Sequence, residues 1–310
     1  VLVRDRRLYV SGAHAVHGLH AVVVQKPRFY ILLRVHRERI VHARRVFVEL
    51  PDAELVAVHS HTGLLPVLPE VRHGHIVSAE LELECLGVLR REIRKIGGKA
   101  EIFQADVADP AQAEGMVREF IRQFGGIDIL VNNAGGALKI PKGEFPDMPL
   151  EYWDYQIRLN LGAAAYTAHT AIGYMREHSI RGRIINVSSI HSLVTWVKRK
   201  MLPYSPAKAG LNMLTKALAV ESAKYGIAVN GIAPGFIMTK LSARYSESDM
   251  AAFLRKIPLG RLGKVEDITP MMLFLADWDK SAFITGQTFV IDGGQSIDGG
   301  IDSMLDSYEK

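Results

Sequence analysis

The sequence predicts an α/β fold, a doubly wound parallel sheet in a single domain, with an atypical N-terminal segment before it. Helical stretches alternate with short apolar stretches from about residue 84 onward. Several of the apolar stretches, such as residues 127–131 and 183–187, are apolar on both faces, as expected of strands that helices cover on each side. No repeat, low-complexity tract or Pro/Gly/Ser-rich linker divides this part of the chain. Residues 84–310 are therefore expected to form one body.

The expected elements follow one another in a regular order. Residues 84–96 have helical character and end at Gly97 and Gly98, which can supply a left-handed cap, and residues 100–105 follow as a strand. The later elements are a helix near 110–124, a strand at 127–131, a long helical region from about 150, a strand at 183–187, a helix around 204–225, a strand at 227–232 and a last strand at 288–291. Alternation of this kind is typical of a parallel sheet with helices on both faces.

Length and composition favour a soluble, cytoplasmic protein. The 310 residues are 48% hydrophobic, which is enough for one large buried core. No uninterrupted apolar run reaches the roughly 18 residues of a membrane-spanning helix, and the first residues lack the basic-then-apolar order of a signal peptide. The lone cysteine, Cys85, excludes an internal disulfide and is expected to fill space in the core.

The charge distribution argues against a polyanionic partner. Residues 1–83 carry 11 Lys and Arg against 8 Asp and Glu, and the rest of the chain carries 27 against 25. The main body is therefore nearly neutral, although the whole chain has a formal net charge of +5. We expect a small-molecule substrate, and neither nucleic acid nor a membrane as a partner.

Residues 1–83 differ in composition from the rest, because they hold nine of the twelve histidines and ten arginines but one lysine. Three accounts are open. The segment is mistranslated, read in another frame or strand, which the composition favours; or it is a divergent first βαβ unit with strands at 29–35 and 46–50; or its histidines bind a metal. No Cys or carboxylate cluster of recognised spacing supports the third account, so we expect no metal site.

Tyr204 and Lys208 lie four residues apart in a helical stretch, which places a phenol and an amine on one helix face. Pro206 between them fits near the start of a helix, where its missing amide hydrogen costs little. A nearby ammonium group favours the ionised form of a phenol, so such a tyrosine could exchange a proton with a substrate oxygen. Taken alone, this pair is more typical of an ordinary solvated helical surface.

Polar and glycine-containing turns follow three of the expected strands. They are Val-Asn-Asn-Ala-Gly at 131–135, Asn-Val-Ser-Ser at 186–189 and Ala-Pro-Gly-Phe-Ile-Met-Thr at 233–239. Each turn alone has an ordinary structural interpretation. Together they converge on the carboxyl edge of a parallel sheet, where open α/β folds bind ligands.

In this order, the motifs resemble those of the classical short-chain dehydrogenase/reductase family, from roughly residue 84 to residue 294. The resemblance implies a Rossmann-like fold and an NAD(P)-dependent oxidoreductase that moves a hydride between nicotinamide and an alcohol or carbonyl substrate. It implies NAD or NADP as the cofactor, which would carry the redox chemistry while the protein positions and polarises.

The resemblance also assigns roles to individual residues. Tyr204 would be the general acid/base, with Lys208 tuning it and bonding the nicotinamide ribose. Ser189 would orient the substrate, and Asn160 would hold a water in the proton relay. The implied cofactor-binding residues are Asp106, Val107, Asn132, Ala134, Gly135, Tyr204, Lys208, Pro234, Gly235, Ile237 and Thr239.

Two features of this region leave the site and the substrate open. Ser189 and Tyr204 are fifteen residues apart, slightly more than in the family, so an extra loop at 197–203 is expected, and Ser188 or Ser192 is an alternative hydroxyl.

Residues 188–191 with Trp196 are similar to sugar dehydrogenases of the family, which hints at a sugar or polyol; 3-oxoacyl thioesters and steroids are alternatives. Residues 241–262 would form a substrate lid, which is also interpretable as an ordinary surface helix.

The phosphate-binding loop of the family is not recognisable in this sequence. The nearest candidate, residues 10–18, has Val16 where the middle glycine belongs, and Gly18 lies 88 residues before Asp106, far more than the family needs. A rival hypothesis is therefore a cofactor-less binding or scaffold protein on the dehydrogenase fold. The resemblance further implies a homo-oligomer, dimer or tetramer, with interfaces around residues 150–175 and 205–225.

Overall fold

The computed structural model describes residues 99–137, 144–196, 201–238 and 245–297, together with the backbone of four short strands nearer the amino terminus. These four strands are β1 (Leu8–Val10), β2 (Leu19–Gln25), β3 (Tyr30–Val35) and β4 (Val46–Val48). The other strands are β5 (Lys99–Gln104), β6 (Ile129–Asn132), β7 (Arg183–Val187), β8 (Ala228–Pro234) and β9 (Thr288–Ile291). The helices are α2 (Pro110–Phe124), α3 (Leu150–Ile157), α4 (Ala163–Glu177), α5 (Tyr204–Ser222), α6 (Glu247–Leu254) and α7 (Val265–Ala276).

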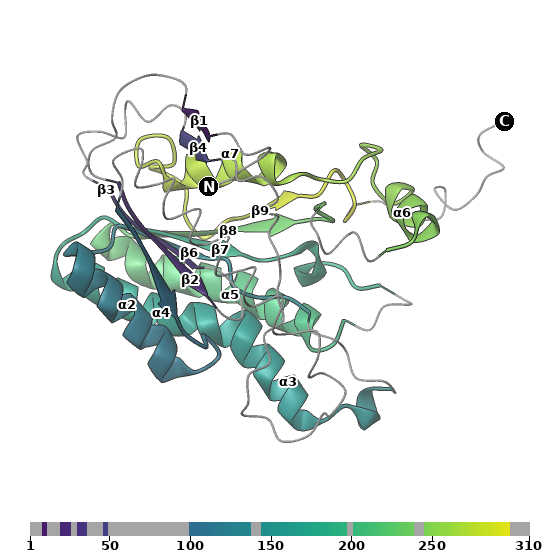
Figure 1. Cartoon of the computed structure of the whole chain (residues 1–310), viewed down its shortest axis with the longest axis horizontal. Helices are drawn as coiled ribbons and strands as arrows, with labels where there is room; N and C mark the ends of the chain where they lie inside the picture. Colours follow the sequence, from purple (N-terminus) through teal and green to yellow (C-terminus); the bar gives the residue numbers. More distant parts are fainter. Residues whose placement is uncertain are drawn as a thin grey trace.

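One seven-stranded sheet in the order β5-β2-β3-β6-β7-β8-β9 forms the centre of the molecule. Helices α2, α4 and α5 lie on one face of this sheet and α7 lies on the other (Figure 1). Strands β6, β7, β8 and β9 run parallel, so their carboxyl ends meet at one edge. The predicted α/β fold with helices on both faces is therefore confirmed.

One strand runs against the predicted direction. β3 is antiparallel to both of its neighbours, β2 and β6. Only residues 26–29 separate β2 from β3, and a parallel connection needs roughly a dozen residues or more, so an antiparallel arrangement is the one that the chain length allows. The strand expected at 29–35 is thus present in the sheet, whereas β4, at the position of the other expected strand, pairs with β1 outside it. The helix expected at 84–96 and Cys85 lie outside the described residues.

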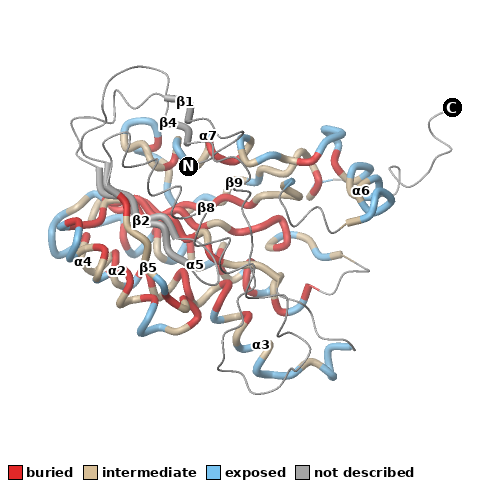
Figure 2. Tube along the Cα trace, viewed as in Figure 1, coloured by how far each residue is buried: buried red, intermediate tan, exposed pale blue. Residues whose placement is uncertain are grey.

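The core lies on both faces of the central parallel strands, because β6, β7 and β8 are buried along nearly all of their length, whereas no residue of β9 is buried. Every residue of β6 and all but the last residue of β8 are buried, and Figure 2 shows buried residues concentrated along the central strands. On one face, Phe120 of α2, Leu159 and Met175 belong to the larger apolar cluster; on the other, Ile268 and Leu275 of α7 pack against the sheet. Burial on both faces explains why these strands are apolar throughout.

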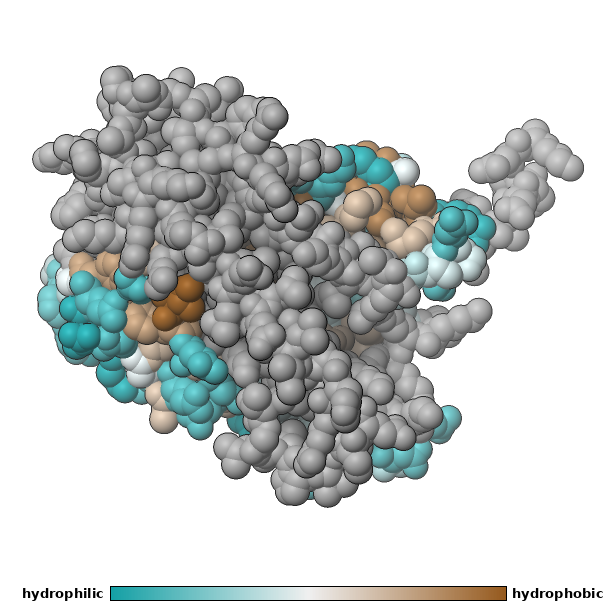
Figure 3. All heavy atoms as spheres, viewed as in Figure 1, coloured by the Kyte–Doolittle hydropathy of each residue, from teal (hydrophilic) through white to brown (hydrophobic). Residues whose placement is uncertain are grey.

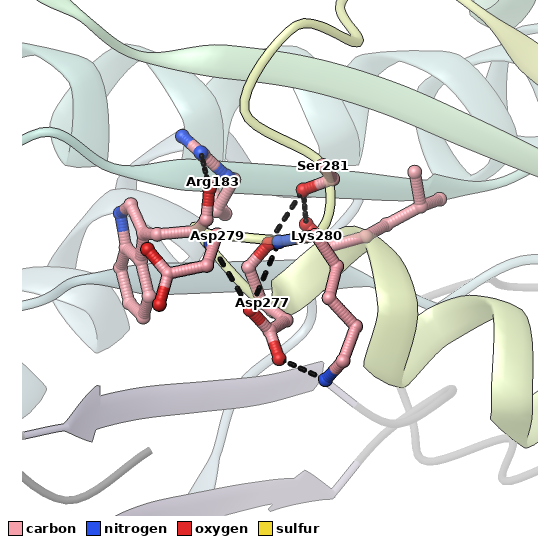
Figure 4. Close-up of polar contacts among 7 residues, drawn as sticks. Arg183, Asp277, Asp279, Lys280 and Ser281 are labelled. Carbon is pink, nitrogen blue, oxygen red and sulfur yellow. Dashed lines mark hydrogen bonds and ion pairs between the residues drawn. The ribbon is translucent and has the colours of Figure 1, made fainter. Parts of the chain in front are cut away.

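The carboxyl end of α7 is fixed at the sheet edge opposite to the strand ends that carry the motifs (Figure 4). The Asp277 carboxylate accepts the amide hydrogens of Asp279 and Lys280 at 3.0 and 3.2 Å and pairs with the Lys280 ammonium. The Ser281 hydroxyl donates to the Asp277 carbonyl at 2.7 Å. Arg183, at the start of β7, lies 5.6 Å from the centre of the Trp278 ring. These contacts join α7 to the beginning of β7.

Within the described ranges, no helix is both long and apolar enough to cross a bilayer. In the same ranges, no group of three His, Cys, Asp or Glu side chains is arranged to hold a metal ion.

Candidate active site

Tyr204 and Lys208 lie in the first two turns of α5, which begins at Tyr204 and therefore has Pro206 in its first turn, as expected. Lys208 is only 2% exposed, and its Nζ atom donates to the Val187 carbonyl at 2.8 Å, at the end of β7. The same Nζ atom lies 5.8 Å from the centre of the Tyr204 ring. A buried ammonium group is thus anchored to the sheet edge next to the phenol.

Asn160 lies in a π-helical turn, Arg158–Gly162, inserted between α3 and α4. π-turns inside helices are frequent at functional sites. The Asn160 side chain accepts the Gly136 amide hydrogen through Oδ1 at 2.5 Å and donates through Nδ2 to the Gln156 carbonyl at 3.0 Å. Asn160 therefore joins the helix to the segment that follows β6.

Gly135 is the point where three segments approach most closely. A Cβ atom at Gly135 would lie 2.8 Å from both Asn160 Oδ1 and Lys208 Nζ, and the residue has a φ of +149°. Only glycine fits here without displacing one of these two side chains. The strand end after β6, the π-turn and α5 therefore meet around one glycine.

The structure separates the three serines that the sequence offered. The Ser188 hydroxyl donates to the Lys208 carbonyl at 3.3 Å, and the Ser192 hydroxyl donates to the Ser189 carbonyl at 2.5 Å. Ser189 Oγ instead accepts the His191 amide hydrogen at 3.2 Å, which leaves its own hydrogen for another acceptor. Asn212 of α5 donates to Ser192 Oγ at 2.8 Å and so holds the loop that carries Ser189.

A buried polar network lies behind these residues, and the sequence pattern did not reveal it. Asn132 and Asn186 are paired in register at the ends of β6 and β7, and Asn132 Nδ2 donates to Asn186 Oδ1 at 2.8 Å. Asn132 Oδ1 accepts from Thr167 of α4 at 2.8 Å, and Asn186 Nδ2 donates to Thr215 of α5 at 2.9 Å. Two asparagines at matching positions of neighbouring parallel strands were the available signal. The Asn132 side chain is thus occupied in joining β6, β7 and α4, and Asn186 extends the network to α5.

The comparisons with known proteins identify the family. A family model described as enoyl-(acyl carrier protein) reductase matches residues 76–296. The chain belongs to the short-chain dehydrogenase/reductase family. It is an oxidoreductase, and the cofactor expected from the sequence, NAD or NADP, is that of the family.

Two relatives and one solved structure place the chain among the dehydrogenases of this family. It is 40% identical to the (2S)-[(R)-hydroxy(phenyl)methyl]succinyl-CoA dehydrogenase subunit BbsD of Thauera aromatica, over 62% of this chain and 75% of the relative. It is 36% identical to 3beta-hydroxysteroid dehydrogenase 1 of Eggerthella lenta, over 67% and 78%. A gluconate 5-dehydrogenase from Burkholderia cenocepacia, solved with NADP and tartrate, is 32% identical with a TM-score of 0.62, over 69% of this chain and 82% of that one.

The third motif of this short-chain dehydrogenase/reductase follows β8. The Gly235 amide donates to the Ile291 carbonyl at 3.0 Å, and a Cβ atom at Gly235 would lie 2.6 Å from the Asp292 Cβ atom, so a side chain has no room there. Ile237 forms a parallel bridge with Gly263, which uses the Phe236 carbonyl and the Met238 amide. The Ile237 amide and carbonyl consequently face the other side of the segment. Pro234 ends β8, and Thr239 lies outside the described residues.

Three further residues assigned to cofactor binding lie at the same sheet edge: Asp106 and Val107 follow β5, and Ala134 follows β6. Asp106 Oδ1 accepts the Ala108 amide hydrogen at 3.0 Å, and the Val107 side chain is fully buried. Ala134 is buried after β6. In the candidate phosphate loop, residues 11–18 lie outside the described residues.

Proposed function

We propose that this chain reversibly transfers a hydride between NAD(P) and a secondary alcohol or its ketone, with Tyr204 as the general acid/base. The observation that carries the proposal is the gathering of Tyr204, Lys208, Asn160 and Ser189 around one edge of the sheet. The phenol and the buried ammonium group of α5 lie there with a hydroxyl from the segment after β7. The hydroxy(phenyl)methyl and 3beta-hydroxysteroid groups in the names of two relatives are secondary alcohols, which supports this substrate class.

Each residue has a physical role in this proposal. The Ser189 hydroxyl donates to the substrate oxygen, because accepting the His191 amide hydrogen through Oγ leaves the hydroxyl hydrogen for this bond. In reduction, the Tyr204 phenol gives its proton to that oxygen; in oxidation, the phenolate takes it back. The Lys208 ammonium favours the phenolate electrostatically, and Asn160 positions the Gly136 segment and the π-turn. Bound NAD(P) supplies the hydride donor or acceptor.

The described residues fit the nicotinamide end of such a cofactor. Lys208 presents an ammonium group that can donate hydrogen bonds to ribose hydroxyls. The Ile237 amide and carbonyl face away from the bridge to Gly263 and can therefore bond a carboxamide. The space that a side chain would occupy at Gly135 lies beside Lys208. Asp106 and Val107 at the end of β5 would flank the adenine.

The test is a titration of the folded chain with NADH and NADPH, followed by turnover of secondary alcohols and ketones. We expect saturable binding of at least one cofactor. Tyr204→Phe should lower kcat by about 10²- to 10⁴-fold, the usual contribution of a general acid/base, while cofactor binding is retained. Tyr225→Phe is the matched control, because it removes a phenol hydroxyl from the turn after α5 and should leave kcat unchanged.

A binding or scaffold protein without cofactor is the second candidate function, and the unrecognisable phosphate loop is the observation that favours it. Failure of the correctly folded chain to bind either nucleotide would overturn the dehydrogenase proposal and support this alternative. For the substrate, the sequence favoured a sugar or polyol, and the similarity to a gluconate 5-dehydrogenase is consistent with that prediction. The side chains around Tyr204 favour a different class, as argued below.

We also propose that the chain forms a homo-oligomer through α5. On its outer face, Met213 and Val220 are 62% and 82% exposed, beside the exposed residues Ala209, Ala217 and Lys216. An exposed apolar helix face of this kind suits a second copy of the same helix, related by twofold symmetry. A cytoplasmic location stays a prediction from the sequence.

A further inference from the structure

Aromatic rings form an unbroken series of contacts from Tyr204 to α6. The ring centres of Tyr204 and His191 are 6.0 Å apart, and those of His191 and Trp196 are 4.5 Å apart. Trp196 lies 5.8 Å from Phe253 of α6. We call this series the aromatic wall; its members are His191, Trp196, Tyr204, Phe236, Tyr245 and Phe253.

The far end of the aromatic wall is a compact group of three rings. Phe253 stacks on Phe236 with ring centres 4.4 Å apart, and Tyr245 meets Phe253 edge-on at 5.1 Å and Phe236 at 5.5 Å. Phe236 belongs to the motif after β8, whereas Tyr245 and Phe253 belong to the α6 region. The aromatic wall therefore joins the segments around the phenol to the expected substrate lid.

The partial exposure of the aromatic wall suits a surface that binds a substrate better than a part of the protein core. His191 is buried, but Trp196, Phe236, Tyr245 and Phe253 are only half-buried. No residue of α6 is buried. On the face drawn in Figure 3, hydrophilic colour covers much of the α6 region and hydrophobic colour gathers beside it. Half-buried rings that are connected to the reacting phenol through His191 can cover more apolar surface when a ligand lies against them.

The chemistry of these rings distinguishes between substrate classes. Phe236 and Phe253 have no polar atom, and Trp196 has one donor and no acceptor. A sugar or polyol would lose hydrogen bonds to water at each hydroxyl placed against such rings. An apolar ring would instead stack or meet them edge-on, as aromatic pairs do.

We propose that the substrate is a secondary alcohol or ketone that carries an aromatic or other apolar ring, and that Trp196, Phe236 and Phe253 bind this ring. This inference rests on the proposed dehydrogenase function and replaces the sugar or polyol expected from the sequence. Because the aromatic wall begins at Tyr204, a substrate whose oxygen meets the phenol can extend along the wall and place its ring against these side chains.

The experiment compares kcat/KM for 1-phenylethanol, 2-propanol and a polyol such as sorbitol. We expect the wild type to prefer 1-phenylethanol over both by about tenfold or more, the discrimination that a hydrophobic pocket provides. Phe253→Leu should reduce kcat/KM for 1-phenylethanol by about tenfold and leave that for 2-propanol nearly unchanged. Phe283→Leu is the control, because Phe283 is fully exposed outside the aromatic wall; it should alter neither value.

A preference for the polyol, or an equal loss for both alcohols in a folded Phe253→Leu, would overturn the inference, since the rings would then serve only to hold α6. A second measurement does not depend on turnover: acetophenone binding, observed by saturation-transfer NMR, should be present in the wild type and weaker in Phe253→Leu. Acetophenone that fails to bind, or binds both equally, contradicts the substrate class. Failure of NADH and NADPH to bind contradicts the proposed function instead, so the two failures are distinguishable.

Discussion

At the scale of single residues, Gly135 constrains the site most tightly. Because a Cβ atom there would press on both Asn160 Oδ1 and Lys208 Nζ at 2.8 Å, even alanine must displace one of the two groups. The sequence motif identified Gly135 as a cofactor-lining residue. The structure gives a second reason for glycine at this position, the close packing of the strand end, the π-turn and α5.

We expect Gly135→Ala to lower kcat/KM by about 10²-fold, the usual cost of misplacing a catalytic group by an ångström or so. Gly115→Ala in α2 is the matched control, because nothing lies within 4 Å of the added atom. That substitution should leave activity unchanged and stabilise the fold by up to about 1 kcal/mol, since alanine is the better helix former. Steady-state kinetics and thermal unfolding of both variants measure these effects. Kinetic constants of Gly135→Ala equal to those of the wild type would contradict the expectation and show that Lys208 tolerates the added methyl group.

The sequence was informative about residues whose function depends on chain spacing, and less so about those whose function depends on contacts. Tyr204 and Lys208 lie on one helix face as their spacing predicted. Asn132 was assigned to cofactor binding, but its side chain bonds Asn186 and Thr167 in the buried network. Neither threonine of that network follows from any local motif, because the contacts join elements that are far apart in the sequence.

At the scale of elements, the start of α7 depends on one charged aspartate. Arg261 donates to both oxygens of Asp267 at 2.7 and 2.8 Å, and the Lys264 amide donates to the same carboxylate at 2.7 Å. The hydrogen bond from Arg261, with the backbone hydrogen bond from Lys264, lowers the pKa of Asp267 from 3.8 to about 2. These bonds close the first turn of the helix.

Because the pKa of Asp267 is lower in the folded state, the ionised group stabilises the fold above pH 4, and this contribution is lost as the pH falls through about 2. As the pH falls from about 4 to about 2, the free energy of unfolding should therefore decrease less in Asp267→Asn than in the wild type. At neutral pH the variant is the less stable of the two. Urea unfolding at several pH values measures the difference. Asp154→Asn, on the exposed side of α3, controls for the removal of a surface carboxylate. Parallel pH profiles for wild type and Asp267→Asn would contradict the expectation.

Element boundaries were predicted well where periodicity was regular and less well where it was interrupted. The helix expected from 204 and the strands expected at 183–187 and 288–291 begin at those residues. The long helical region from about 150 is divided by the π-turn at Arg158–Gly162, which hydrophobic spacing does not signal. The direction of β3 could not be read from its residues either, since apolar alternation is the same in both directions.

At the scale of the whole molecule, the exposed apolar face of α5 predicts an assembly. Val220→Asp places a charge on this face and should convert the oligomer to monomers, because burying an unpaired carboxylate at an interface is costly. Val220→Ala is the control, which reduces apolar area without adding charge and should assemble more nearly as the wild type does. Light scattering coupled to gel filtration measures both. A monomeric wild type, or an oligomer that persists in Val220→Asp, would contradict the role of α5.

The direction of β3 also determines whether a strand begins or ends at the middle of the sheet edge where the motifs lie. In parallel strands, each carboxyl end leads toward a helix whose amino-terminal dipole attracts phosphate. Between β2 and β6 the chain instead enters the sheet, with Tyr30, the first residue of β3, opposite Asn132. The sheet edge at which β6, β7 and β8 end therefore also carries the start of β3, so a ligand lying along this edge would meet a strand that enters the sheet beside strands that leave it.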